Sequence, residues 1–222
     1  IYFYINAYKL SKSIIFMVSE REVAEQTVIV TDSLYSLESE GDRIRADIAE
    51  QTLRSAVERG YEIIVVDGGS PEGLLTEFKD LGAHVYAQEQ KGMGNGRRQG
   101  FGLALETEKP VIARTEIEKV HYIPEIWKTG LPILGKEADL IIPRRNSLES
   151  YPRFQQLCEE AGNLYASEVT GRHLDLWFGP RTGSREIFGG PFMKYNGEFG
   201  DKWESIFMPV LNALLNGKRV ME

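Results

Sequence analysis

The stretch Val65-Val66-Asp67-Gly68-Gly69-Ser70-Pro71-Glu72-Gly73 decides the fold that this sequence predicts. It completes the β-branched apolar run 61–66, whose composition is typical of a strand buried on both faces. Two glycines follow, and they let the backbone turn sharply and approach a ligand closely. Asp67 would then lie at the carboxyl end of its strand, where open α/β sheets bind ligands. An ordinary strand-to-helix turn with Ser70 as N-cap is the alternative.

Strand and helix patterns alternate on both sides of this stretch. Strands are predicted at 27–31, 61–66, 83–87 and 110–114, and helices at 43–59, 74–81 and 96–106. Short connections between alternating strands and helices indicate an α/β fold with a mainly parallel central sheet and right-handed crossovers.

The alternation loosens after His121. The elements expected there are a helix at 124–128, a strand at 138–143, a helix at 149–169, a strand at 184–188 and a helix at 203–215. Residues 1–26 are expected to form an N-terminal appendage and residues 27–222 a single domain. Because the chain lacks an initiator methionine and ends in what resembles an unfinished strand, we expect it to be part of a longer product.

Composition restricts the class of protein. Of 222 residues, 42% are hydrophobic and 27% are charged, which is ordinary for a globular domain. The net charge of -7 argues against general nucleic-acid binding, which requires excess positive charge. Cys158 is the only cysteine and is expected in a helix core, so a reducing, cytoplasmic location is predicted. No apolar run has the length of a transmembrane segment.

The loop Gly92-Met93-Gly94-Asn95-Gly96-Arg97-Arg98 opens a predicted helix. Helix N-termini present free N–H groups and partial positive charge to anions, and arginine adds forked donors that match phosphate oxygens. The loop therefore predicts contact with a phosphate or nucleotide. It does not match a dinucleotide fingerprint, because Arg98 replaces the third glycine and the loop follows the third strand. A flexible turn with solvated arginines is the plain alternative.

Glu116 and Glu118 follow the fourth predicted strand. Side chains at i and i+2 of an extended segment point the same way, so the two carboxylates would converge. Such a pair suits Mg²⁺ or Mn²⁺ beside phosphates. A solvated acidic turn is the alternative, and the neighbouring Lys119 weakens the metal interpretation. His121 would be a further ligand, although a lone histidine is more often structural.

These three motifs, in this order, resemble the nucleotide-sugar-binding half of glycosyltransferases of the A-type fold, in particular the large inverting family 2 and its polyprenyl-phosphate and phosphoglycerate-linked relatives. The resemblance covers roughly residues 27–120 and extends to an Asp-Gly-Gly-Ser segment, a G-x-G-x-x-R loop and Glu-x-Glu in place of Asp-x-Asp. It implies an A-type, Rossmann-like fold in which 27–120 binds the donor and 121–222 the acceptor. Glu-x-Glu places its carboxylates one methylene further out.

The resemblance also implies roles for single residues. Asp32 and Asp67 would contact the nucleoside, Arg97 or Arg98 the diphosphate, and Glu116 with Glu118 the divalent ion. The complete set of donor-binding residues that we predict is Asp32, Asp67, Gly68, Gly92, Gly94, Arg97, Arg98 and Arg181.

The C-terminal half should supply the acceptor site and, if the enzyme inverts, a general base. The candidate bases are Asp201, Glu204 and Asp175, and Asp175 begins a segment through Gly183 that weakly resembles the family's acceptor region. The aromatic residues Trp177, Phe178 and Trp203 would stack on a sugar, or else belong to the core or a lid.

The expected function is transfer of a sugar, a hexose by expectation, from a nucleoside-diphosphate-sugar donor with the help of Mg²⁺ or Mn²⁺. The acceptor would be a small molecule, a lipid phosphate or a glycan. A non-catalytic protein of the same fold that binds a nucleotide or nucleotide sugar is the alternative, and a sugar nucleotidyltransferase ranks last because no Gly-rich loop follows the first strand. A homo-oligomer in which the apolar residues 1–5 pack on another subunit is also considered.

Overall fold

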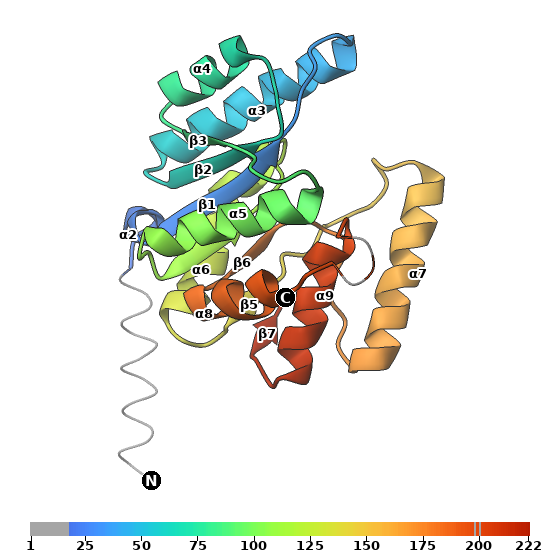
Figure 1. Cartoon of the computed structure of the whole chain (residues 1–222). Coiled ribbons are helices and arrows are strands. Elements are labelled where there is room, and N and C mark those ends of the chain that lie inside the picture. Colours follow the sequence, from blue (N-terminus) through green and yellow to red (C-terminus); the bar gives the residue numbers. More distant parts are fainter. Residues whose placement is uncertain (1–17, 198, 200) are drawn as a thin grey trace.

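A seven-stranded sheet forms the centre of the computed structural model, which describes residues 18–197, 199 and 201–222 (Figure 1). The strand order is β3-β2-β1-β4-β6-β5-β7. The strands are β1 (Thr27–Ser33), β2 (Glu62–Asp67), β3 (His84–Ala87), β4 (Val111–Arg114), β5 (Leu140–Ile141), β6 (Arg181–Ser184) and β7 (Val220–Met221). Only β6 runs antiparallel to its neighbours β4 and β5, so the prediction of a mainly parallel sheet is confirmed.

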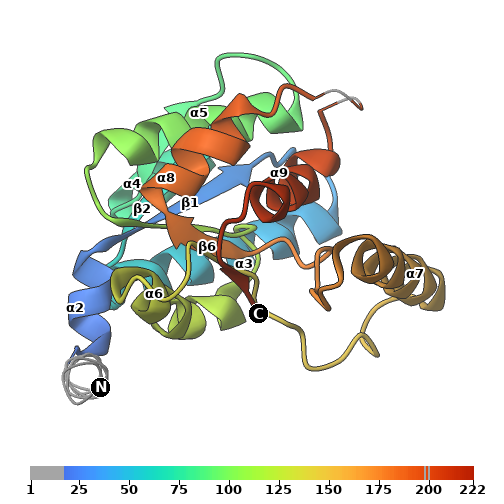
Figure 2. The ribbon, with the colours of Figure 1, turned by 90° about the horizontal axis from the view of Figure 1, so that it is seen from below.

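Helices cover both faces of the sheet (Figure 2). The helices are α2 (Glu20–Glu25), α3 (Glu40–Glu58), α4 (Glu72–Asp80), α5 (Met93–Glu106), α6 (Ile126–Leu134), α7 (Arg153–Thr170), α8 (Arg185–Ile187) and α9 (Glu204–Leu215), with the 3-10 helix η1 (Val120–Glu125) and the π-helix η2 (Phe188–Phe192). Helices α3, α4 and α6 pack on one face, and α5, α8 and α9 pack on the other. The result is a three-layer α/β/α domain.

The strand β2 illustrates why this sequence forms a sheet covered on both sides. Ile63 and Val65 pack under α3 and α4, whereas Ile64 and Val66 pack under α5. Alternate residues of a strand point to opposite faces, so a continuous β-branched run buries both. The strand therefore sits near the middle of the fold and fixes the position of the loop that begins at Asp67.

Two expectations differ from the structure: the strand at 184–188, and the extended chain at 116–118 after the fourth strand. The predicted strand at 184–188 is helical, because the Ser184 side chain accepts a hydrogen bond from the Ile187 amide at 3.3 Å and starts α8. The strand precedes it, at Arg181–Ser184. The fourth strand ends at Arg114, and residues 116–119 form a turn in which the Lys119 amide donates to the Glu116 carbonyl at 3.0 Å.

The short helix α2 packs against α6, with Val23 and Ala24 fully buried. Glu20 forms an ion pair with Arg59 at 2.5 Å. Residues 20–25 of the predicted appendage are thus joined to the domain, whereas the apolar residues 1–5 lie outside the described residues. None of the helices in the described ranges is both long and apolar enough to cross a membrane.

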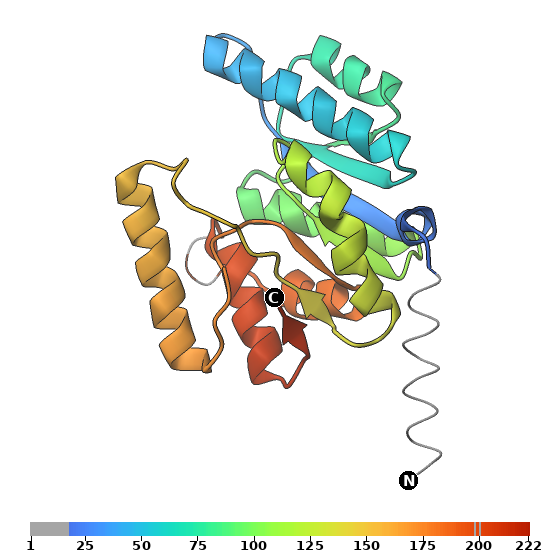
Figure 3. The same ribbon diagram turned by 180° about the vertical axis from the view of Figure 1, so that it is seen from behind.

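Helix α7 stands at the rim of the molecule beside α9 (Figure 1 and Figure 3). Only Glu159 and Ser167 are buried along its 18 residues. The expectation that Cys158 lies in the core is wrong, because this side chain is exposed.

Candidate active site

The candidate site lies at the carboxyl ends of β1, β2 and β4 and at the first turn of α5. Parallel pairing brings these ends together: Ser33 is in register with Asp67, and Val30 with Arg114. The carboxyl edge of an open α/β sheet is where such folds bind their ligands.

Arg114 links two of the predicted acids at this edge. Its side chain is only 3% exposed. It donates to Asp32 at 2.9 Å and lies 3.6 Å from the Glu116 carboxylate. Burial opposes the charged form, but Asp32 and Glu116 outweigh it and raise the pKa of Arg114. Asp32 and Glu116 therefore meet through a guanidinium that the sequence analysis did not single out.

Arg97 adds further positive charge to this edge. It is 4% exposed, and it donates to the Lys202 carbonyl at 2.9 Å and to Ser205 Oγ at 2.5 Å. Burial, and then repulsion from Arg114, lower the pKa of Arg97 to about 9. Its Nε–H group is buried and donates to no partner in the described part of the chain. Arg97 thus anchors the start of α9 to α5 while it faces the same charged cluster.

The Asp67 carboxylate holds the loop that follows β2 through internal hydrogen bonds. One carboxylate oxygen accepts from the Gly69 and Ser70 amides at 2.8 and 2.7 Å, and the other from the Ser33 and Ser70 hydroxyls at 2.6 Å each. The side chain is therefore fully engaged, and a nucleoside would meet the loop that Asp67 organises. Gly68 is exposed beside Leu34 and Gln88. The predicted nucleoside contacts of Asp67 and Gly68 stay predictions.

Arg98 and Asp201 join α5 to the C-terminal segment. The guanidinium makes two hydrogen bonds to the Asp201 carboxylate, at 2.8 and 2.6 Å. Gly94 is required at this junction, because a Cβ atom there would lie 1.6 Å from Asp201 Oδ1. Gly92 caps α5 with a positive φ of 110°. Of the predicted phosphate arginines, Arg97 lies near Arg114, whereas Arg98 is bound to a predicted base.

The two predicted metal ligands point to different partners. Glu118 accepts from the Tyr35 hydroxyl at 2.8 Å and from Arg45 at 2.7 Å, on the α3 side. Glu116 lies against Arg114 and Gly179, where a Cβ atom would come within 1.9 Å of Glu116 Oε1. The two carboxylates have different partners, because the chain turns after Arg114 instead of staying extended. Their predicted role as metal ligands stays a prediction.

The described side chains do not by themselves form a complete site for a divalent ion. Glu116 Oε2 is buried without a hydrogen-bond partner among the described residues, which would suit an ion. However, the cations Arg114 and Lys119 already flank it at 3.6 and 3.7 Å. No cluster of three or more potential ligands occurs within residues 18–197, 199 and 201–222. Mg²⁺ beside phosphates is usually bound by one or two carboxylates together with phosphate oxygens and waters, so a site at Glu116 would need a bound phosphate to complete it.

A cleft of about 570 Å³ opens beside Glu116. The Lys119 ammonium lies over the rings of Tyr151 and Phe178, at 5.9 and 5.7 Å. The aromatic residues of the cleft are Tyr151, Phe154, Trp177, Phe178 and Trp203. The aromatic residues that we predicted for the acceptor half therefore lie together in one cleft, beside Glu116.

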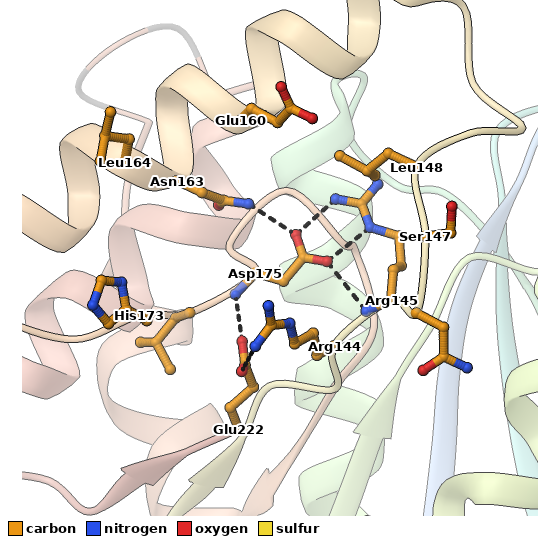
Figure 4. Close-up of a pocket in the computed structure, with 12 residues that line it drawn as sticks. Arg144, Arg145, Ser147, Leu148, Glu160, Asn163, Leu164, His173, Asp175 and Glu222 are labelled. Carbon is orange, nitrogen blue, oxygen red and sulfur yellow. Dashed lines mark hydrogen bonds and ion pairs between the residues drawn. The ribbon is translucent and has the colours of Figure 1, made fainter.

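Asp175 lies in a second pocket, of about 570 Å³, on the other side of Arg145 (Figure 4). Its carboxylate accepts from Arg145 at 2.6 and 2.8 Å and from Asn163 at 3.1 Å. Burial opposes ionisation, but these contacts outweigh it and lower the pKa of Asp175. Glu222 accepts a hydrogen bond from the Asp175 amide at 2.9 Å, so both the side chain and the main chain of Asp175 are fixed.

Arg181 and Glu204 also form hydrogen bonds to main-chain groups of the protein. Arg181 is fully buried and donates to the Leu176, Phe178 and Pro180 carbonyls. Burial, and then Arg114, lower the pKa of Arg181 to about 9. Glu204 accepts from the Lys202 amide at 2.9 Å at the start of α9. Both residues shape the loops around the cleft, and their predicted ligand and base roles stay predictions.

Four charged residues around the site were not selected from the sequence as functional: Arg114, Lys119, Arg145 and Glu159. Glu159 lines the cleft and pairs with Arg145 at 2.5 Å. The position of Arg114 at the end of an apolar strand was a usable signal, because a charge there must find a partner at the sheet edge. Glu159 carried no such signal, since it is one of several acids in a helix.

Comparisons with known proteins agree with this architecture. The family model of Glycosyl transferase family 2 matches residues 43–112. A comparison with curated proteins found no match. The solved structures that resemble the chain include glucosyl-3-phosphoglycerate synthase from Mycobacterium tuberculosis in complex with Mn²⁺, UDP-glucose and phosphoglyceric acid. The sequence identity is 15% and the TM-score is 0.66. The match covers 92% of this chain and 73% of the synthase chain.

The same mycobacterial enzyme in complex with Mg²⁺ and UDP gives a TM-score of 0.66 at 15% identity, covering 92% and 72% of the two chains. The complex of that enzyme with phosphoglyceric acid gives a TM-score of 0.65 at 16% identity, and the match covers 92% of this chain and 73% of the enzyme chain. The chain therefore has the A-type glycosyltransferase fold, and its resemblance to family 2 glycosyltransferases is confirmed.

Proposed function

We propose that this protein transfers a sugar from a nucleoside-diphosphate-sugar donor to a hydroxyl acceptor. The observation that carries the proposal is the cluster of Asp32, Arg114 and Glu116 at the carboxyl ends of β1 and β4. It opens onto an aromatic cleft in a fold whose solved examples include complexes with UDP-glucose. The family 2 match over 43–112 supports the same assignment.

The positive charge of the site would serve the leaving group. In the transfer, the bond between the sugar carbon C1 and the diphosphate oxygen breaks, and a bond from the acceptor oxygen to C1 forms. The diphosphate leaves with the electron pair, so negative charge develops on its oxygens. Arg114, Lys119 and the nearby Arg97 would stabilise that charge in a partly water-excluded site.

The cleft beside Glu116 would hold the acceptor and the sugar. Aromatic rings such as Trp177 and Trp203 bind the apolar faces of sugars, and a hexose is of a size to meet them. The acceptor hydroxyl loses its proton to a carboxylate if the reaction inverts. Glu116 and Glu159 are the acids that line this cleft. The carboxylates of Asp175, Asp201 and Glu204 already accept hydrogen bonds within the protein.

A divalent ion is a further candidate for the site. Mn²⁺ or Mg²⁺ accompanies the ligands in similar structures. Because the carboxylates Glu116 and Glu118 point to different partners here, no step is assigned to an ion. A titration of UDP and GDP with and without Mn²⁺ would show whether an ion contributes to binding.

The direct test is a transfer and donor-hydrolysis assay with UDP- and GDP-hexoses, combined with calorimetry of UDP and GDP binding. We expect nucleoside-diphosphate binding and slow hydrolysis of one donor even before the acceptor is known. The proposal would be overturned if no nucleoside diphosphate bound to the folded protein.

A second candidate function is binding of a nucleotide sugar without turnover. The observation that favours it is that all three predicted bases are engaged in internal hydrogen bonds or ion pairs. The same experiments separate the two functions: binding with neither hydrolysis nor transfer, across donors and acceptors, would favour the binding protein.

A further inference from the structure

Helix α7 presents an apolar face to solvent. The exposed fractions are 80% for Phe154, 75% for Tyr165 and 64% for Val169. Leu157, Leu164 and Cys158 are exposed on the same helix. Exposed apolar surface of this extent on one element is typical of an interaction site rather than of a free surface.

The exposed residues form a single stripe along the helix. At 3.6 residues per turn, about 100° per residue, positions 154, 157, 158, 161, 164, 165, 168 and 169 fall within one arc. Ala161 lies at the centre of this arc and also midway along the stripe. Leu157 and Leu164 flank it on one side, and Cys158 and Tyr165 flank it on the other.

This arrangement is complementary to itself. If a second α7 lies antiparallel, with Ala161 facing Ala161, Leu157 meets Leu164 of the other copy. Cys158 meets Tyr165 in the same way. The small side chain of Ala161 lets the two helices approach closely at the two-fold symmetry axis. Packed helices need a distance of roughly 8–10 Å between their helix axes.

The charges at the ends of the stripe agree with the same register. Arg153 begins α7 and Glu168 lies near its end, and both are exposed. In the antiparallel pair, Arg153 of each copy lies beside Glu168 of the other, whereas a parallel pair would bring like charges together. Opposite charges at the rim fix the orientation of such a contact.

We propose that two copies of this chain associate through α7, antiparallel and with the two-fold axis at Ala161. The interface is isologous, so the same stripe serves both copies. Phe154 and Cys158 also line the aromatic cleft. The second copy would therefore lie beside the mouth of that cleft and restrict access to it.

Cysteine cross-linking tests the register directly. The variant Ala161→Cys, made in a Cys158→Ser background, places two thiols at the proposed axis, within reach of a disulfide. Mild oxidation should convert most of this variant to a covalent dimer on a non-reducing gel. Glu160→Cys in the same background is the matched control, because residue 160 points about 100° away from residue 161. Equal cross-linking of the two variants, or none in Ala161→Cys, would overturn the proposal.

Light scattering after gel filtration tests the association itself. The double variant Leu157→Asp/Tyr165→Asp should be a folded monomer at concentrations where the unaltered chain is a dimer, because both side chains are exposed and their loss disturbs no core. Leu215→Asp, at a side chain 84% exposed on α9, should leave the dimer intact. A chain that stays monomeric and floats with anionic vesicles would identify α7 as a membrane-binding face and refute the pairing.

Discussion

At the scale of single residues, partners decide which acids remain available to a ligand. Glu116 and Glu118 are two positions apart and chemically identical, yet Glu118 is bound by Tyr35 and Arg45, whereas Glu116 faces the cleft. The difference arises from the turn that follows Arg114. It places the two carboxylates in separate surroundings, Glu118 beside Tyr35 and Arg45 and Glu116 beside the cleft.

Glu118→Ala is expected to lower the free energy of unfolding by about 1–3 kcal/mol, because the buried Tyr35 hydroxyl and Arg45 lose their acceptor. Nucleotide affinity should stay within twofold, since the side chain does not line the cleft. Urea unfolding and calorimetry with UDP and GDP measure the two quantities. A loss of affinity with unchanged stability would instead support the original metal assignment of this residue.

Asp175 is expected to contribute to the loss of folding stability at acid pH. Because its pKa is lowered in the folded state, it contributes stability above the unfolded value of about 4, and this contribution disappears as the pH falls through the lower folded pKa. Asp175→Asn should cost about 1–3 kcal/mol at pH 7, because Arg145 then keeps only Glu159 as a charged partner.

The corresponding measurement is urea unfolding of both proteins between pH 7 and pH 3. The difference between the unaltered chain and Asp175→Asn should shrink as the pH falls below about 4. A difference that stays constant across this range would show that the carboxylate does not titrate as described.

At the scale of elements, the sheet and its crossovers were predictable, because each strand and helix carried its own periodicity. The predicted helix 43–59 and strand 61–66 agree with α3 and β2 within a few residues. The structure at 184–188 was not predictable in the same way, because the capping hydrogen bond of Ser184 starts a helix in a segment without a clear strand pattern. Likewise, the turn after Arg114 depends on packing against Gly179, which is distant in sequence.

The junction between α5 and the C-terminal segment yields a test at this scale. Gly94→Ala should lower the free energy of unfolding by about 1–3 kcal/mol, because the new methyl group collides with Asp201 and displaces the ion pair of Arg98. Nucleotide affinity should fall as well, since the first turn of α5 moves.

Gly73→Ala is the matched control, because α4 offers open space around this position and alanine favours a helix. It should keep or slightly raise stability. If thermal unfolding showed the two substitutions to be equivalent, the close contact between Gly94 and Asp201 would be ruled out.

At the scale of the whole molecule, sheet topology unites residues that are far apart in sequence. Asp32, Arg97 and Glu116 were selected from separate motifs, and parallel pairing brings their elements to one edge. The sequence did not indicate that Arg114 would stand between two of them, since its partners are fixed only by the fold. For the same reason, Asp175 and Asp201 resembled free acids in the sequence and are paired in the structure.

The central claim is that the cations Lys119, Arg114 and Arg97 bind the diphosphate of a nucleotide. Calorimetry of UDP and GDP binding to Lys119→Gln tests it most directly, because Lys119 lines the cleft and holds no short ion pair. We expect about a tenfold loss of affinity, the effect of removing one charge-assisted contact. Lys128→Gln, on the exposed face of α6, should bind like the unaltered chain. Equal affinities for all three proteins would contradict the account.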